Sequence, residues 1–172
     1  MAIIIEDGSI VANADSYVSE ADTDTYNTSY VGSTDWSTAT TADKEIALRQ
    51  ATQYLDTVYF NKWRGERVSS NQALQWPRVY AEYDDGICIS DSEIPVPLKK
   101  AAMELAIKAT QQTASLLVDV DGANQQIKAK TEKVGPLTKA VEYVGSASTQ
   151  KKFTIVERLV RPLLTTSFVE RA

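Results

Sequence analysis

The chain has 172 residues, of which 43% are hydrophobic and 24% charged, and its formal net charge is −5. It contains no histidine and one cysteine, Cys88, which excludes an intramolecular disulfide and a Ser-His-Asp triad and leaves almost nothing to build a zinc site. The chain has no run of 18 or more apolar residues, so we expect no membrane span. The apolar run at residues 3–5 is too short for a signal peptide and lacks a basic flank. We therefore expect a single-domain cytosolic protein that is not an enzyme and has no cofactor or metal.

The first half of the chain predicts two helices after a short β-type start. Residues 2–5 and 9–11 are β-type runs around an Asp-Gly turn signal and predict a small N-terminal hairpin. Ser19, with Asp22 in the first turn, predicts a helix over 19–29. A Ser/Thr-rich loop over 32–41 then leads to a second helix from about 42 to 58, because apolar residues recur there every three or four positions.

The second half predicts an acidic loop, two further helices and a long hairpin. Residues 80–92 read as the loop, and Pro95 and Pro97 precede a helix over about 98–117. The runs 127–134 and 137–144 predict a β-hairpin, which must lie on this domain or on a neighbouring subunit because two strands alone are marginal in water. A last helix over 151–164 is ended or kinked by Pro162. The predicted fold is mainly α: a small helical bundle with a protruding hairpin, its core formed by the second and third helices.

Charge is distributed unevenly along the chain. Residues 1–60 carry a local charge of −8, residues 61–80 carry +3, residues 81–93 carry −5 and residues 94–172 carry +5. Such asymmetry suits a protein whose copies meet acidic face to basic face, or one that presents a limited basic surface to a polyanion. Scattered solvated charge is the alternative interpretation.

Residues 62–78 gather two of the three tryptophans with several basic side chains. In one interpretation the indoles cover the ends of the second and third predicted helices, and Arg64 and Arg67 lie over them or pair with nearby carboxylates. Gly65 is then a turn residue with unusual dihedral angles. In the other, exposed indoles and cations bind single-stranded nucleic acid by stacking and phosphate contacts. The acidic total favours the first interpretation. The candidate nucleic-acid residues are Lys62, Trp63, Arg64, Arg67, Trp76 and Arg78.

Acidic pairs invite a metal interpretation that their spacing does not support. Residues 119–124 begin like a calcium loop but lack the remaining ligands and the terminal glutamate. Asp84 and Asp85 lie in a turn sequence with no ligand pattern around them. We expect these carboxylates to be solvated loop residues.

Several stretches together resemble a family encoded among the head and tail morphogenesis proteins of tailed phages. The most specific are Trp63-Arg64-Gly65-Glu66-Arg67 and Ala73-Leu74-Gln75-Trp76-Pro77-Arg78. The others are residues 14–18, 42–56, 94–106 and 133–136. Members of this family are labelled DnaT-like single-strand-binding proteins, and in length, helix content and hairpin they also look like head-to-tail adaptors.

The resemblance implies a structural virion protein, a head-completion adaptor in a cyclic, dodecameric ring between portal and tail through which duplex DNA passes. Its implied partners are the portal and the tail or stopper proteins, with no membrane, and its implied location is the head–tail interface after assembly in the host cytoplasm. Single-stranded-DNA binding is the alternative function. We expect one domain over 1–172, with an N-terminal arm (1–18), a hairpin arm (127–144) and a C-terminal tail (165–172). The candidate interface residues are Lys128, Lys130, Lys133, Leu137, Tyr143 and Phe168.

Overall fold

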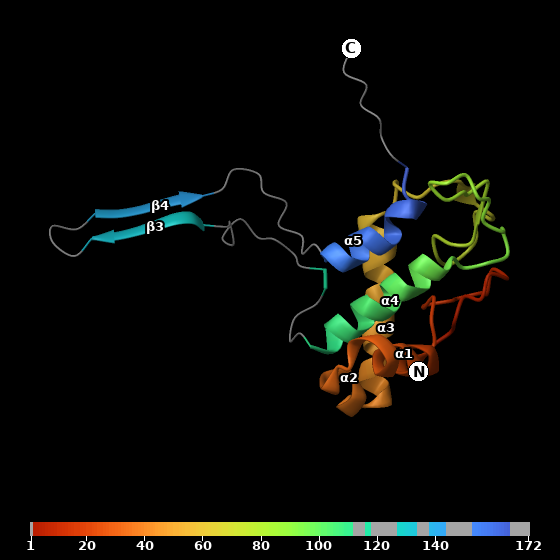
Figure 1. Cartoon of the computed structure of the whole chain (residues 1–172), viewed down its shortest axis with the longest axis horizontal. Helices are drawn as coiled ribbons and strands as arrows, with labels where there is room; N and C mark the ends of the chain where they lie inside the picture. Colours follow the sequence, from red (N-terminus) through yellow and green to blue (C-terminus); the bar gives the residue numbers. More distant parts are fainter. Residues whose placement is uncertain (1, 112–115, 118–126, 134–137, 144–152, 166–172) are drawn as a thin grey trace, which may run out of the picture. The chain divides into compact units, whose positions relative to one another are not determined.

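The computed structural model describes residues 2–111, 116–117, 127–133, 138–143 and 153–165. The chain forms two compact units, Met1–Leu116 with Phe153–Ala172, and Leu117–Lys152 (Figure 1). The first is the helical unit and the second holds the hairpin. The predicted mainly α fold with a β-hairpin is confirmed.

Helix α1 (Glu20–Tyr26) begins where the sequence predicts, because the Ser19 side chain accepts a hydrogen bond from the backbone N–H of Asp22. It continues as a π-helical turn, Asn27–Val31. The predicted loop over 32–41 is wrong in part, because a short helix, α2 (Thr34–Thr38), forms there. Ser33 caps α2, and Trp36 is fully buried, with its indole Nε1 donating to Asp24 Oδ1 at 2.7 Å.

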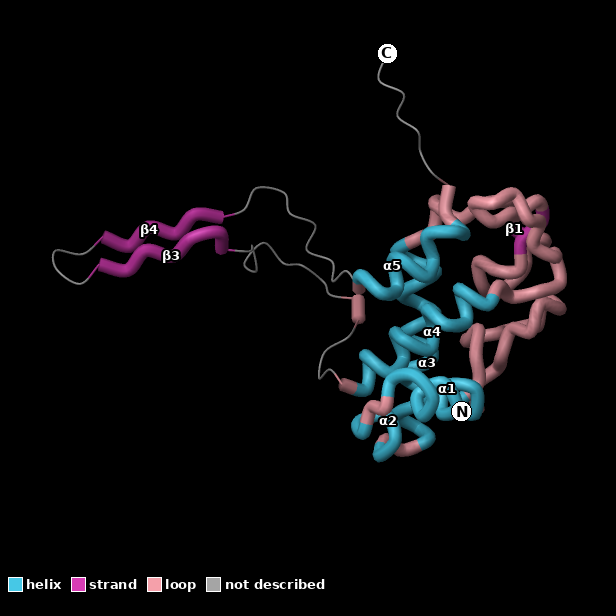
Figure 2. The backbone as a smooth tube through the Cα atoms, viewed as in Figure 1, coloured by secondary structure: helices cyan, strands magenta, loops and turns pink. Residues whose placement is uncertain are grey.

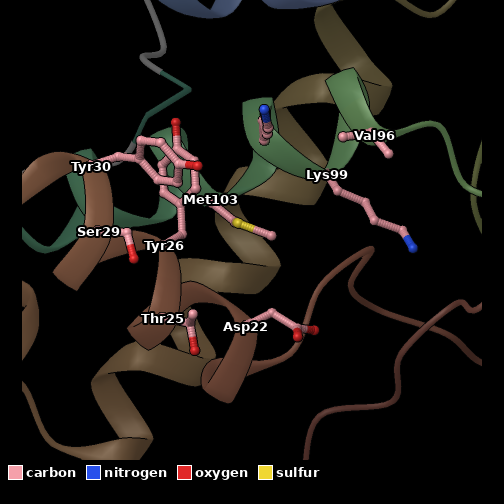
Figure 3. A pocket seen from close by; sticks show the side chains of 9 residues that line it. Asp22, Thr25, Tyr26, Ser29, Tyr30, Val96, Lys99 and Met103 are labelled. Atoms are coloured by element: carbon pink, nitrogen blue, oxygen red, sulfur yellow. The ribbon is translucent and has the colours of Figure 1, made fainter.

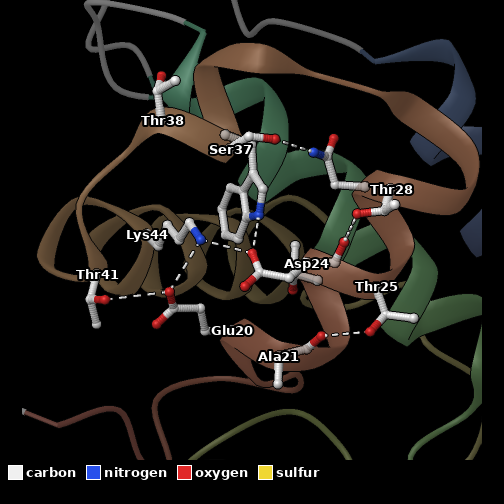
Figure 4. Close-up of polar contacts among 12 residues, drawn as sticks. Glu20, Ala21, Asp24, Thr25, Thr28, Ser37, Thr38, Thr41 and Lys44 are labelled. Atoms are coloured by element: carbon white, nitrogen blue, oxygen red, sulfur yellow. Dashed lines mark hydrogen bonds and ion pairs between the residues drawn. The ribbon is translucent and has the colours of Figure 1, made fainter.

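A buried lysine joins α1 to α3 (Thr41–Val58) (Figure 4). The Lys44 ammonium lies 2.8 Å from Asp24 and 3.2 Å from Glu20, and it sits 5.3 Å from the centroid of the Trp36 ring. The hydrogen bond to Asp24 raises the pKa of Lys44 above its usual value. The buried ammonium is therefore paired with two partly exposed carboxylates rather than left alone.

Helices α3 and α4 (Val96–Thr110) pack against each other as the sequence predicts (Figure 2). Fully buried leucines on both helices alternate with alanines, which allow the two backbones to approach closely. The leucines are Leu48 and Leu55 on α3 and Leu98 and Leu105 on α4. The α-helix ends at Thr110, short of the predicted residue 117.

Helix α5 (Thr154–Val160) packs on α4 and passes directly into a 3-10 turn, Arg161–Leu163, that contains Pro162. The predicted end of the helix at this proline is confirmed. Val156, Val160 and Leu163 are fully buried, so the C-terminal segment forms part of the core of the helical unit.

The predicted N-terminal hairpin is wrong: residues 2–18 contain one isolated parallel bridge, between Ile5 and Ser16. The carboxylate of Glu6 is buried and accepts from the backbone N–H groups of Gly8, Ile10 and Val11, at 2.9, 3.0 and 2.9 Å. A side chain thus takes the backbone donors that a second strand would have used.

In the second unit, strands β3 (Ile127–Lys133) and β4 (Thr138–Tyr143) pair antiparallel, which confirms the predicted hairpin. Lys133 pairs with Thr138 next to the turn and Ile127 pairs with Tyr143 at the open end. The register shifts between Ile127 and Ala129, so the regular alternation predicted for this strand is interrupted there.

Candidate functional site

A two-residue ladder brings both tryptophan segments of the candidate site together. Strand β1 (Glu66–Arg67) pairs with β2 (Arg78–Val79). The rings of Trp63 and Trp76 meet edge to face at 6.0 Å, and Trp63 also lies 5.5 Å from the ring of Tyr59 at the end of α3. Trp76 is 0% exposed and Trp63 is 4% exposed. A base therefore has no indole face to stack on in this conformation.

Arg78 is buried against the same segment and closes it. Its guanidinium donates to the carbonyl oxygens of Arg64 at 2.8 Å, Gly65 at 2.7 Å and Gln75 at 3.2 Å. Burial lowers the pKa of Arg78 from its usual high value. These three bonds commit the guanidinium to the backbone of its own chain.

Arg64 links the segment to two others. It donates to the carbonyl oxygens of Leu164 at 3.0 Å and Tyr83 at 3.2 Å, and it pairs with Asp84 at 2.5 Å. Beside it, Trp63 forms an antiparallel bridge with Leu164. We call Trp63, Arg64, Gly65, Trp76 and Arg78 the tryptophan–arginine clamp.

The clamp holds the C-terminal segment against the end of α3. Backbone hydrogen bonds from Arg64 N to Leu163 O (3.0 Å) and from Thr165 N to Lys62 O (2.7 Å) complete this attachment. The sequence interpretation in which the tryptophans cover helix ends agrees with the structure, although the segments that the clamp joins are α3 and residues 163–165 rather than α3 and α4.

Gly65 has the unusual dihedral angle that the sequence predicts, φ +69°. A Cβ atom at this position would lie 2.3 Å from the carbonyl oxygen of Val79. The backbone of β2 approaches so closely that only glycine fits.

A buried tyrosine and a carboxylate hold the loop that carries Trp76. Tyr17 donates its hydroxyl proton to Asp56 Oδ1 at 2.5 Å, and Gln75 N donates to Asp56 Oδ2 at 3.1 Å. The hydroxyl oxygen of Tyr17 accepts from Gln75 N at 3.1 Å and Trp76 N at 3.3 Å. Burial raises the pKa of Asp56 to about 6, even though these hydrogen bonds act in the opposite direction.

Of the six candidate nucleic-acid residues, four belong to the clamp, and Lys62 and Arg67 are exposed. Lys62 lies over the Tyr59 ring at 5.7 Å. Among the interface candidates, Lys128, Lys130 and Lys133 lie on β3 and Tyr143 lies on β4, whereas Leu137 and Phe168 fall outside the described residues. Their roles in binding stay predictions.

The structure also forms a groove that sequence reasoning missed. It lies between α1 with its π-helical turn and the start of α4, and its volume is about 420 Å³. Figure 3 shows Tyr26, Tyr30 and Met103 together, with Val96 and Lys99 farther along α4. We call it the lysine–tyrosine groove; its lining residues are Asp22, Thr25, Tyr26, Ser29, Tyr30, Val96, Lys99, Lys100 and Met103. In the sequence, only the i, i+4 spacing of Tyr26 and Tyr30 and the adjacent Lys99 and Lys100 indicated this groove.

The acidic loop after β2 is an ordered turn. Ile89 N donates to Ala81 O at 2.8 Å and Tyr83 N donates to Ile87 O at 2.9 Å, while Glu82 bridges to Cys88. Glu82, Asp84, Asp85 and Ile87 are exposed. We call residues 82–88 the acidic turn.

Two features are absent from the part of the chain that the structure describes. No group of three or more His, Cys, Asp or Glu side chains there is placed to hold a metal ion. None of the described helices has both the length and the apolar character of a membrane span. The calcium-like stretch 119–124 lies outside the described residues.

The fold and the clamp define a small, mainly helical protein whose conspicuous tryptophan–arginine motif forms part of the core. A family model described as "Putative DnaT-like ssDNA binding protein" matches residues 1–172, and the chain therefore belongs to this family. Comparisons with curated proteins and with solved structures found no match.

Proposed function

We propose that this protein is a structural, non-enzymatic assembly protein: a head-to-tail adaptor that forms a ring with portal and tail or stopper proteins of a tailed-phage particle. Duplex DNA would pass through the ring. The observation that carries the proposal is the hairpin. Strands β3 and β4 form a compact unit of their own, and an isolated two-stranded ribbon buries too little apolar surface to be stable in water. A neighbouring subunit would supply the missing surface.

The clamp supports the same proposal because its residues have a structural role, which removes the reason to assign them to nucleic-acid binding. The two indoles that suggested a nucleic-acid platform are buried, and two of the four basic side chains, Arg64 and Arg78, donate to backbone carbonyl oxygens of the chain itself. The motif is thus explained by folding, without a nucleic-acid ligand. Ring components also need arms that reach neighbours, and the hairpin has the form of such an arm.

Native mass spectrometry and light scattering test this proposal with the full chain, alone and mixed with portal protein. We expect cyclic oligomers or a portal complex. If the protein stays monomeric at high concentration and never joins a portal, the adaptor function is refuted.

Single-stranded-DNA binding is a second candidate, supported by the family description and by one structural observation. Tyr30 is 73% exposed in the lysine–tyrosine groove, beside Lys99 and Lys100. Exposed rings next to cations are the usual elements of a sequence-tolerant single-strand site.

Fluorescence anisotropy with labelled oligonucleotides tests the second candidate. Binding should fall steeply with added salt and be weakened by Tyr30→Ala with Lys100→Ala, whereas Lys108→Ala, on the same helix outside the groove, should bind as the wild type does. Absence of binding at low salt would eliminate this function.

A further inference from the structure

We infer that the lysine–tyrosine groove of one copy receives the acidic turn of the next copy. The inference rests on the proposed ring and names one of its subunit contacts. It follows from two surfaces of the helical unit whose charge and apolar character are complementary.

The groove offers apolar surface with cations beside it. Tyr30 and Val96 are 73% and 52% exposed, and Lys100 Nζ lies 6.0 Å from the centroid of the Tyr30 ring. Neither Lys99 nor Lys100 forms an ion pair with a carboxylate of the described residues. A volume of about 420 Å³ is enough for a few side chains.

Two carboxylates near the groove have partners within the chain. Asp22 lines the groove and accepts the hydroxyl proton of Ser19 at 2.6 Å. Glu104 is buried and accepts from the hydroxyl of Tyr26 at 2.9 Å. Lys99 and Lys100 are the cationic side chains that line the groove, and the charge of Lys99 also helps to lower the pKa of Asp7.

The acidic turn has the complementary character. Asp84 is held by Arg64, but Glu82 and Asp85 are exposed on either side of it, and Ile87 is 60% exposed. The backbone hydrogen bonds within the turn hold its backbone in a defined conformation, which lowers the entropic cost of docking.

Tyr80, at the base of the turn, adds an exposed ring on a strained backbone. Its φ is +56°, a left-handed conformation that is unfavourable for a residue other than glycine, yet its side chain is 88% exposed. Burial within the helical unit does not offset this cost. A neighbouring copy would cover the Tyr80 ring together with Ile87.

The occupant is a second copy rather than the same chain, because the acidic turn does not lie in the groove of its own chain: no residue of 82–88 lines the groove, and Ile87 is 60% exposed. In Figure 1 the loop after β2 lies beyond the N-terminal end of α4. A contact between two different surfaces repeats from copy to copy and closes into a ring when the rotation allows. We expect each contact to be weak and sensitive to salt, since it rests on one turn and a few exposed charges.

Charge reversal on both surfaces tests the contact. The groove variant carries Lys99→Glu and Lys100→Glu, and the turn variant carries Glu82→Lys and Asp85→Lys. In a low-salt buffer each variant alone should associate at least tenfold more weakly than the wild type. An equimolar mixture of the two should regain association, because each groove then meets a turn of opposite charge.

Matched controls and the possible outcomes separate this inference from the proposed ring. Lys108→Glu, on α4 outside the groove, should associate as the wild type does, and circular dichroism should show every variant folded. If both charge variants assemble like the wild type, the groove–turn contact is refuted and the ring stands. If no variant and no wild-type sample assembles, with or without portal, the ring itself is refuted.

Cross-linking provides a second test, which also detects weak association. Wild-type protein, with Cys88 on its acidic turn, is mixed with a Ser29→Cys, Cys88→Ser variant, with oxidised glutathione as the oxidant. Ser29 lines the groove, so the mixed disulfide dimer should form several-fold faster than with a Thr34→Cys, Cys88→Ser control on α2. Equal rates for the two would overturn the contact.

Discussion

At the scale of single residues, two glycines with positive φ allow the energetic cost of backbone strain to be measured apart from the cost of a steric clash. Gly65→Ala places a Cβ atom 2.3 Å from a carbonyl oxygen, whereas Gly86→Ala, at φ +81°, meets nothing within 4 Å. We expect Gly86→Ala to cost about 1 kcal/mol of unfolding free energy and Gly65→Ala clearly more, roughly 3 kcal/mol. Urea unfolding followed by circular dichroism measures both, and equal losses would show that the close approach of β2 does not matter.

Asp56 predicts a particular dependence of stability on pH. Its pKa rises from 3.8 to about 6 on folding, so the folded protein retains the proton more strongly. The protonated carboxyl of Asp56 therefore stabilises the folded protein below about pH 4, and this stabilisation is lost as the pH rises through about 6. The free energy of unfolding changes by roughly 2 kcal/mol after allowance for partial exposure.

Asp56→Asn removes this titration and isolates its effect. The unfolding free energy of the variant, relative to that of the wild type, should be higher at pH 7 than at pH 4, because only the wild type must bury a charge at the higher pH. Urea unfolding at both values measures the difference. The same difference at both pH values would mean that Asp56 does not titrate in this range.

At the scale of elements, the clamp is predicted to be a stability element. Arg78→Gln should lower the unfolding free energy by about 2–3 kcal/mol, since carbonyl oxygens of Arg64, Gly65 and Gln75 lose a charged donor. Arg67→Gln, on the exposed neighbouring strand, should stay within about 0.5 kcal/mol of the wild type.

Thermal unfolding and oligonucleotide binding, measured on both variants, decide between the structural and the nucleic-acid interpretation of the motif. A stable, folded Arg78→Gln protein with reduced affinity for single-stranded oligonucleotides would favour the nucleic-acid interpretation. A folded protein with a lowered melting temperature and unchanged affinity would support the structural one.

The sequence predicted those elements that depend on local pattern. Helix α3 was predicted because its apolar residues recur every three or four positions, and in the structure Thr40 caps it by accepting from Asp43 N. Helix α2 was missed because five residues carry little periodicity, and Trp36 is held by Asp24, twelve positions away. The N-terminal hairpin failed because the Glu6 side chain takes its backbone donors.

The candidate site was predicted less completely, for a related reason. The motif identified the residues of the clamp, but the backbone of Trp63 is bridged to Leu164, about a hundred positions later in the chain, which no local pattern indicates. The lysine–tyrosine groove likewise depends on packing of Tyr30 near α4, which no local pattern encodes.

At the scale of the whole molecule, the hairpin should be separable from the helical unit. Replacing residues 117–152 by a short Gly/Ser linker should leave the helical unit folded, because its core residues lie in 14–116 and 156–163. Its melting temperature should change by only a few degrees, since the core residues that the structure describes lie outside the deleted segment. Assembly with portal should be lost.

A calorimetric scan checks whether the shortened protein stays folded, and a portal-binding assay on the same sample checks whether assembly is lost. The control is a full-length chain with residues 134–137 replaced by a segment of equal length, which should retain binding. Unfolding of the deleted protein would show that the two units are one cooperative structure.

All three tryptophans are buried, which determines what optical methods can report. Trp36 and Trp76 are 0% exposed and Trp63 is 4% exposed. Their intrinsic emission should be shifted to the blue and resist quenching by acrylamide in the native protein. A fall in this emission when an oligonucleotide is added would signal rearrangement of the core rather than stacking on an indole. Titrations with nucleic acid therefore need a dye on the oligonucleotide, and the indoles are better suited to following unfolding.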